Sequence, residues 1–210
     1  MIQGLDNGQA PEKVDAGDRG DKRIAIIEAA VNTACQVGLE GLSMAEVADR
    51  AKVAKGTLYL YFTSKDQLIQ DAFWHCHEEN VAACDKGLDA IAGALPKLLQ
   101  RLRNAVNWAL RNREKGQFER MCLAKSQYGA TTRYQNQHLQ FKSVDRIIRD
   151  GLDKGELRLL PSPVLGEMFF GIGGAVLYYL LSNPEALEDQ CFWDQVDAGI
   201  TGCLGRVSVD

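Results

Sequence analysis

The residues of this chain best suited to hold another molecule lie in one short stretch, from Lys55 to Tyr61, which reads Lys-Gly-Thr-Leu-Tyr-Leu-Tyr. The stretch combines a cation, a hydroxyl, a pair of tyrosines and a glycine whose bare backbone allows close approach. If a helix begins near Lys55, its first turn adds free N–H groups and a partial positive charge, which suit phosphate. Together these properties indicate a surface that fits the edge of a DNA groove.

The neighbouring residues predict the elements of a helix-turn-helix that would position this stretch. Ser43 followed by Glu46 is a capping box, in which each side chain satisfies a backbone N–H at a helix start. Val53 is the apolar residue expected in the turn between the two helices. Leu58 and Phe62 are spaced one helical turn apart, so they share a face of the second helix and point inward.

Further helices on either side complete a small core. A helix over about 22–37 carries apolar residues at a spacing of three and four, with Asp21 as its expected N-cap and Gly38 at its end. A second capping box, from Ser64 to Gln67, begins a longer helix. Three helices within about 45 residues form the homeodomain-like arrangement.

The run from Lys55 to Phe62, followed by Ser64-Lys65-Asp66-Gln67-Leu68, resembles the signature of the tetracycline-repressor (TetR) family of transcriptional regulators. The resemblance covers about 21–73, roughly a quarter of the chain. It implies an all-α chain with a homeodomain-like three-helix DNA-binding domain and a helical domain for ligand binding and dimerisation. The family usually has glycine where this chain has Lys52 and a capping residue where it has Ala54. We therefore expect Lys52 to adopt a positive φ and Ala54 to leave its helix uncapped.

The resemblance also implies which residues meet DNA. The expected contact residues are Ser43, Lys52, Lys55, Gly56, Thr57, Tyr59, Leu60, Tyr61 and Lys65. Of these, Lys55, Thr57 and Tyr59 are expected at bases or phosphates, and Leu60 against a thymine methyl group. The alternative for Tyr59 and Tyr61 is plain packing in the core.

The implied function is that of a ligand-responsive repressor. Two copies related by a twofold axis would read a palindromic operator with half-sites about 34–36 Å apart, or a multiple of that spacing. A small molecule bound in the C-terminal domain would release the DNA by favouring a wrong spacing of the two recognition helices. The alternative is a helical small-molecule-binding or adaptor protein of the same fold without DNA binding. No cofactor is expected.

Composition and charge predict three parts. These are a disordered polar arm over 1–20, a helix-turn-helix domain over 21–66 and a helical domain over 67–210. The whole chain has a net charge of -4, whereas residues 19–65 carry seven basic and five acidic side chains. This asymmetry has the sign expected of an N-terminal DNA-binding domain.

The C-terminal domain is expected to provide the effector pocket and the interface of a homodimer. Apolar helices at about 164–182 and 191–204 would form a four-helix interface between two copies, as the family resemblance implies. No charge lies between Met168 and Leu181, so we expect that helix to be buried nearly all round. Candidates for lining an apolar pocket, each of which could instead be ordinary core, are Trp74, Trp108, Phe118, Met121, Tyr128, Phe141, Phe170 and Tyr178.

Other classes of function find little support. Neighbouring residues of the His75-Cys76-His77 run point about 100° apart on a helix, so we expect no metal site. The histidines have no nucleophile motif to work with, which argues against an enzyme. The six cysteines include no C-x-x-C pair and indicate reduced thiols in a cytoplasmic protein, with redox sensing as the alternative. No signal peptide is evident, and no run reaches the ~18 apolar residues of a membrane span.

Overall fold

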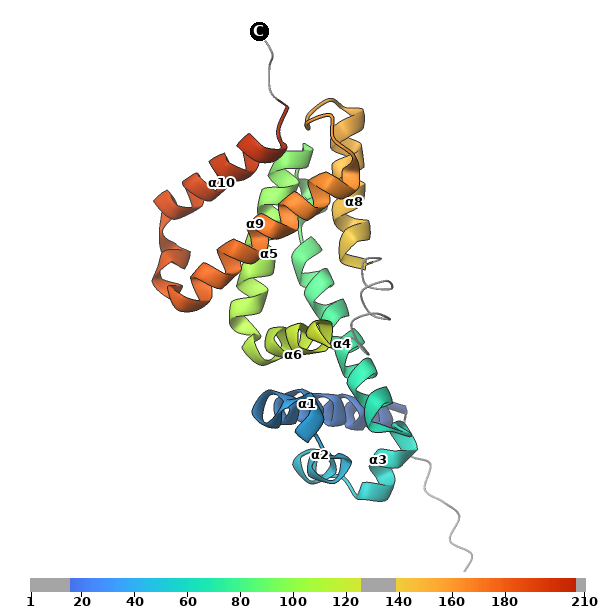
Figure 1. Ribbon diagram of the computed structural model, residues 1–210. Helices are drawn as coiled ribbons and strands as arrows, with labels where there is room; N and C mark the ends of the chain where they lie inside the picture. The colour runs from blue at the N-terminus through green and yellow to red at the C-terminus, as the bar shows by residue number, and fades with distance from the viewer. Residues whose placement is uncertain (1–15, 126–138, 207–210) are drawn as a thin grey trace, which may run out of the picture. The chain divides into compact units, whose positions relative to one another are not determined.

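The computed structural model describes residues 16–125 and 139–206, and helices dominate both ranges (Figure 1). The predicted all-α class is therefore confirmed. The chain divides into two compact units, and the division falls between Ala72 and Phe73, within a helix. The sequence predicts this division at residue 66, within the first turn of the same helix.

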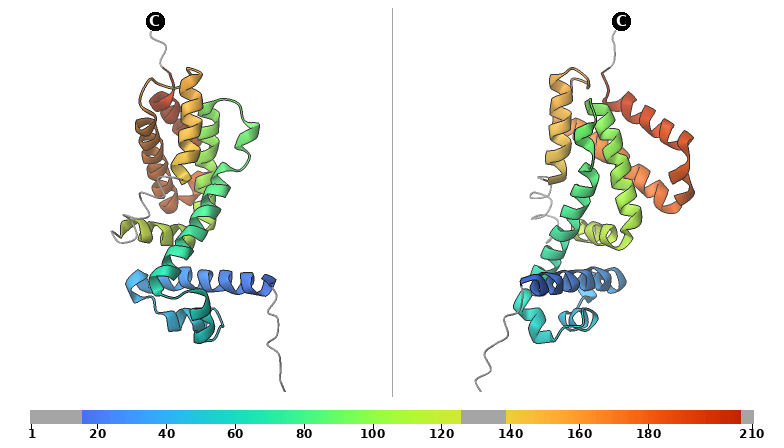
Figure 2. Two further views of the ribbon diagram at one scale, coloured as in Figure 1. Left: turned by 90° about the vertical axis from the view of Figure 1, so that its right-hand side faces the viewer. Right: turned by 180° about the vertical axis from the view of Figure 1, so that it is seen from behind.

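The first unit is a small helical core. Its elements are α1 (Ala16–Gly41), α2 (Met44–Arg50), α3 (Lys55–Tyr61) and the first turns of α4 (Lys65–Asp85). Helix α2 packs against both α1 and α3 (Figure 2). Side chains that are at most 2% exposed come from every element: Ile26, Ile27, Ala34, Leu39, Leu42, Val47, Leu58, Phe62, Leu68 and Ile69. A helix as short as α3 is unstable alone in water. Burial of Leu58 and Phe62, at about 1.5–3 kcal/mol each, holds it in place.

Helix α1 differs from its prediction at its start and agrees with it at its end. It begins at Ala16, so Asp21 lies inside the helix and is not its N-cap. Residues 16–20 are likewise helical, which corrects the arm expected over 1–20; the rest of that arm lies outside the described residues. Gly38 has a φ of 80°, in the left-handed region that favours glycine, and it breaks the helix where the sequence predicted.

The second unit is built around α5. Its elements are the rest of α4, η1 (Leu88–Ala90), α5 (Ala94–Arg111), α6 (Arg113–Ala124), α8 (Leu139–Asp153), α9 (Ser162–Ser182), η2 (Pro184–Glu188) and α10 (Gln190–Leu204). Helix α5 contacts α6, α8, α9 and α10, and α9 contacts α8 and α10 (Figures 1 and 2). The shared core includes Leu98, Val144, Ile148, Leu165, Leu180 and Ile200. An isolated antiparallel bridge joins Leu157, after α8, to Gly205 at the end of α10.

Helix α9 is less buried than the sequence predicted. Only 28% of its most apolar window is buried, and Val164, Tyr178 and Tyr179 are 44%, 78% and 47% exposed. At 21 residues, α9 is also long and apolar enough to cross a membrane by length and composition, although Glu167 interrupts its apolar run. Outside a membrane, a helix of this composition needs a further apolar surface to cover its outer face.

Candidate nucleic-acid interface

The turn between α2 and α3 sets the direction in which α3 leaves the core. The backbone N–H of Lys52 donates to the Asp49 carbonyl at 3.1 Å, and that of Val53 donates to the Ala48 carbonyl at 3.0 Å. Lys52 has a φ of 56°, so the predicted positive φ is confirmed at a cost of about 1–2 kcal/mol for a side chain with a Cβ. The lysine side chain is exposed at this turn, close in sequence to the start of α3.

Side-chain caps fix the starts of α2 and α4. Ser43 Oγ accepts a hydrogen bond from the Glu46 N–H at 3.1 Å, as the first capping box predicted. Ser64 Oγ accepts one from the Gln67 N–H, also at 3.1 Å. The side-chain Oε1 of Gln67 accepts a hydrogen bond from the N–H of Thr63 at 2.8 Å, one residue before the partner that a capping box specifies. The two caps together define where the chain enters and leaves the helix-turn-helix.

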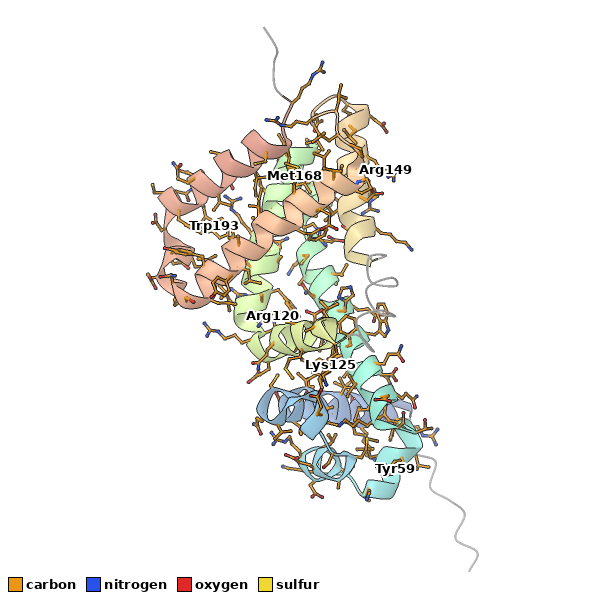
Figure 3. All side chains as sticks on the ribbon, viewed as in Figure 1. Tyr59, Arg120, Lys125, Arg149, Met168 and Trp193 are labelled. Carbon is orange, nitrogen blue, oxygen red and sulfur yellow. The ribbon has the colours of Figure 1, made fainter. Side chains whose placement is uncertain are left out.

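Helix α3 turns one face to the core and the other outward. Leu58 and the adjoining Phe62 are fully buried, whereas Tyr59 is 44% exposed and Leu60 is 86% exposed. Lys55 is exposed as well. Figure 3 labels Tyr59 where its side chain leaves α3. The core-packing alternative for Tyr59 does not fit this exposure, because Leu58 and Phe62 already occupy the inward face.

The remaining hydroxyl groups of α3 are half-buried. Thr57 and Tyr61 are both of intermediate exposure. The Tyr61 ring lies 6.5 Å from the Phe62 ring, centroid to centroid, at an interplanar angle of 35°. Tyr61 therefore packs partly on the core, which is the alternative role considered for it. Thr57 remains partly accessible to a binding partner.

Gly56 has no structural need to be glycine within the chain. It is exposed, it is not among the glycines with positive φ, and a Cβ built on it would meet nothing within 4 Å. Glycine in a helix is less favourable than alanine by roughly 0.5–1 kcal/mol. We therefore expect the missing side chain at this exposed position to serve contact with another molecule.

Two further residues that are predicted to contact DNA also make hydrogen bonds within the chain. The Lys65 ammonium donates to the Glu40 carbonyl at 2.6 Å, which ties the start of α4 to the end of α1. Two of its three N–H bonds are then left for other acceptors. The Ser43 oxygen accepts the capping bond, and its own hydroxyl proton can still be donated outward.

Sequence reasoning missed a residue that positions α3 from α1. The Arg23 guanidinium pairs with the Asp71 carboxylate at 2.9 Å, and its central carbon lies 5.5 Å from the centroid of the Phe62 ring. It thereby links α1, the end of α3 and α4. The pair is separated by 48 positions in the chain, so no local pattern could reveal it.

The second unit contains a cavity of about 240 Å³ between α4, α5 and α9. Its lining residues are Asn80, Cys84, Arg101, Leu102, Ala105, Val106, Ala109, Phe169, Phe170, Gly173, Gly174 and Leu177. The small residues on α5 and α9 leave room for the cavity: a Cβ on Gly174 would meet nothing within 4 Å. On Gly173, by contrast, a Cβ would lie 3.2 Å from Leu102, so that position serves close helix packing.

Of the predicted pocket residues that the structure describes, only Phe170 lines this cavity. Phe118 and Trp108 are buried elsewhere in the second unit, and Trp74 and Met121 are half-buried. Tyr178 is 78% exposed, so it lies at the surface of the single chain. Tyr128 and the side chain of Phe141 lie outside the described residues. This cavity forms where small side chains of α5 and α9 face each other, so large aromatic residues alone do not locate it.

The cavity has a polar end. Arg101 is only 2% exposed, and its Nε donates to Asp85 Oδ1 at 2.9 Å. Ser143 donates to the same oxygen at 2.8 Å. Burial raises the pKa of the Cys84 thiol from 9.0 to about 11, so this cysteine stays protonated at neutral pH. A protonated, buried thiol is a poor nucleophile, which argues against redox sensing at Cys84.

Comparison with known proteins identifies relatives of the first unit. The family described as "Bacterial regulatory proteins, tetR family" matches residues 26–72. The HTH-type transcriptional repressor KstR of Mycobacterium tuberculosis is 42% identical over 76 residues, which make up 36% of this chain and 34% of that protein. The match thus spans about a third of the curated repressor's length.

Solved structures resemble nearly the whole chain. A crystal structure described as a tetR family transcription regulator, from Shewanella sp. PV-4, superposes with a TM-score of 0.79 at 25% identity, over 89% of this chain and 99% of that one. The regulator FadR of Bacillus subtilis, in complex with stearoyl-CoA, gives a TM-score of 0.71 at 20% identity over 84% and 96%. All three relatives are described as regulators of transcription.

Proposed function

We propose that this chain, which belongs to the TetR family of bacterial transcriptional regulators, represses transcription by binding a palindromic operator as a homodimer. A small molecule bound in its second unit releases it from the DNA, and it acts in the cytoplasm. The observation that carries the proposal is the division of α3 into two faces. Leu58 is fully buried, while Tyr59 and Leu60 are exposed at 44% and 86% with no internal task.

The outward residues of α3 suit the two kinds of DNA contact. Lys55 provides a charge for a phosphate, and Gly56 allows the phosphodiester backbone to come close to the helix. Tyr59 and Leu60 can then reach base edges, where the Leu60 side chain fits a thymine methyl group. The Leu60 side chain is 86% exposed, so it is accessible for such a contact.

A dimer through α9 and α10 would cover the exposed apolar face of α9. Tyr178 and Tyr179 are exposed at 78% and 47%, and the Tyr179 ring stacks on Phe192 of α10 at 5.4 Å between centroids. The two helices contact each other within one chain. Two copies that place these helices together would bury the apolar surface and pair two α3 helices for adjacent half-sites.

The cavity of about 240 Å³ is the proposed effector site. Its walls are mainly apolar, and stearoyl-CoA in the FadR complex is a precedent for a partly apolar effector within this fold. An effector that binds preferentially to the DNA-incompetent state needs a coupling of only about 1–3 kcal/mol to weaken operator binding 5–150-fold.

Operator selection from random DNA with the purified full chain tests the proposal. We expect an enriched palindrome whose half-site centres lie about 34–36 Å apart or a multiple of that distance. We also expect an even number of chains on each site, measured by analytical ultracentrifugation of the complex. Failure to enrich any sequence would favour a protein of this fold that does not bind DNA.

A further inference from the structure

We propose that the cavity of the second unit takes an uncharged effector: an apolar body of about eight to ten non-hydrogen atoms that carries one hydrogen-bond acceptor, such as a ketone, ester or thioester carbonyl. The acceptor binds the guanidinium of Arg101. This inference rests on the proposed function only in naming the ligand an effector; its chemistry follows from the cavity itself.

Arg101 is the donor that the cavity leaves unused. It lines the cavity and is 2% exposed, and its Nη2 has no hydrogen-bond partner among the described residues. The amide side chain at the cavity, Asn80, is already partly bonded, with one of its two Nδ2 hydrogens in use. Its Nδ2 donates to Glu119 at 3.0 Å, and its Oδ1 accepts from the Cys84 thiol at 3.2 Å. A buried donor without an acceptor carries its full desolvation penalty, which an acceptor on a ligand would remove.

The charges around Arg101 decide against an anionic ligand. Asp85 already neutralises the guanidinium at 2.9 Å. A second carboxylate, Glu119, is buried nearby and bonds both His77, at 3.1 Å, and Asn80. Both carboxylates help to raise the pKa of the Cys84 thiol, which lines the cavity, so their negative charge acts there. A ligand carboxylate would add further negative charge beside one guanidinium in a buried site, whereas a neutral carbonyl satisfies Nη2 without this cost.

The volume limits the part of the ligand that the cavity encloses. A water molecule occupies about 30 Å³ of liquid, so 240 Å³ holds about eight groups of that size. Side chains such as Leu102, Val106, Phe169 and Leu177 provide apolar contact for these groups. A larger molecule would have to leave its remainder outside.

A matched set of probes tests the ligand class on the full chain without DNA. The probes are 2-heptanone, heptanoate and heptylammonium, which share an apolar chain and differ in charge and acceptor. We expect isothermal titration to give 2-heptanone at least tenfold tighter binding than either ion, the scale of one hydrogen bond to a charged group. Equal or tighter binding of heptanoate, or no binding of 2-heptanone, would overturn the proposal.

Variants of two arginines on α5 locate the contact. Arg101→Lys keeps a cation for Asp85 but lacks the second nitrogen of the fork, so it should weaken 2-heptanone binding about tenfold. Arg103→Lys is the control, because Arg103 pairs with Asp197 at 2.7 Å and does not line the cavity. Circular dichroism checks that both variants fold. Equal affinity of wild type and Arg101→Lys would contradict the assignment.

A gel shift on the selected operator separates this inference from the proposed function. Ketone binding by a chain that binds no operator would refute the regulator proposal and leave the ligand class standing. Operator binding by a chain that ignores the ketone would refute the ligand class alone.

Discussion

Substituting Gly56 by alanine separates DNA binding from folding more cleanly than any other change on α3. Glycine is costly in an exposed helix, and the added Cβ would meet nothing within 4 Å in the chain. The variant should therefore be as stable as the wild type or more stable, by up to about 1 kcal/mol.

Operator binding should move in the opposite direction. If the phosphodiester backbone lies against Gly56, the methyl group pushes it away and breaks a hydrogen bond to a charged group, at a cost of about 1.5 kcal/mol or more per subunit. The dimer loses this twice, about 3 kcal/mol, which corresponds to roughly a hundredfold weaker binding.

Fluorescence anisotropy on the selected operator measures the affinity, and urea unfolding measures the stability. Gly20→Ala is the matched control, since Gly20 is also an exposed helical glycine whose Cβ would meet nothing within 4 Å. Unchanged operator affinity in Gly56→Ala, with the stability gain present, would refute the close approach of DNA to this helix.

Three further changes test other parts of the molecule. Lys55→Ala should weaken binding to all DNA sequences alike and lower the salt slope by about one per subunit, measured by anisotropy at several salt concentrations, without lowering the melting temperature. Tyr178→Glu should give a folded monomer in analytical ultracentrifugation, because the charge would be buried at the dimer interface but is exposed in the single chain. Cys84→Ala should flatten the loss of stability above pH 9 in urea unfolding. The pKa of the Cys84 thiol rises from 9.0 to about 11 on folding. The protonated thiol therefore contributes fully to the free energy of unfolding below pH 9, and this contribution, about 2–3 kcal/mol, is lost as the pH rises through 11.

Each of these has a contrary outcome. A salt slope that Lys55→Ala leaves unaltered would remove the phosphate contact from that lysine. A stable dimer of Tyr178→Glu would place the interface away from this part of α9. An identical pH dependence in Cys84→Ala would mean that groups other than this thiol govern alkaline unfolding.

The first unit could be predicted closely because its signals are local. The caps at Ser43 and Ser64 lie within a few residues of the N–H groups they satisfy, and the inward spacing of Leu58 and Phe62 is a property of one helix. Lys52 could be expected at positive φ because the family that the chain resembles usually has glycine at this position. The start of α1 was predicted too late, because the polar, glycine-containing residues before Asp21 favoured a disordered arm, whereas the helix begins at Ala16.

The second unit could be predicted only in outline because its site is tertiary. The cavity exists where Ala105 and Ala109 of α5 come near Gly174 of α9, and no periodicity in either segment specifies that meeting. The exposure of Tyr178 could not be predicted for another reason. The apolar sequence of α9 indicates that its surface is covered, but it does not tell whether the same chain or a second copy covers it.

The central claim is that α3 reads base edges, and operator selection with Leu60→Gln tests it most directly. Leu60 is 86% exposed and makes no use of its side chain inside the chain, so the substitution should leave folding and dimerisation unchanged. We predict that the selected palindrome keeps its symmetry and half-site spacing but loses its preference for thymine at one position in each half-site. The claim would be contradicted if Leu60→Gln selected the same operator as the wild type, with the same base preference at every position.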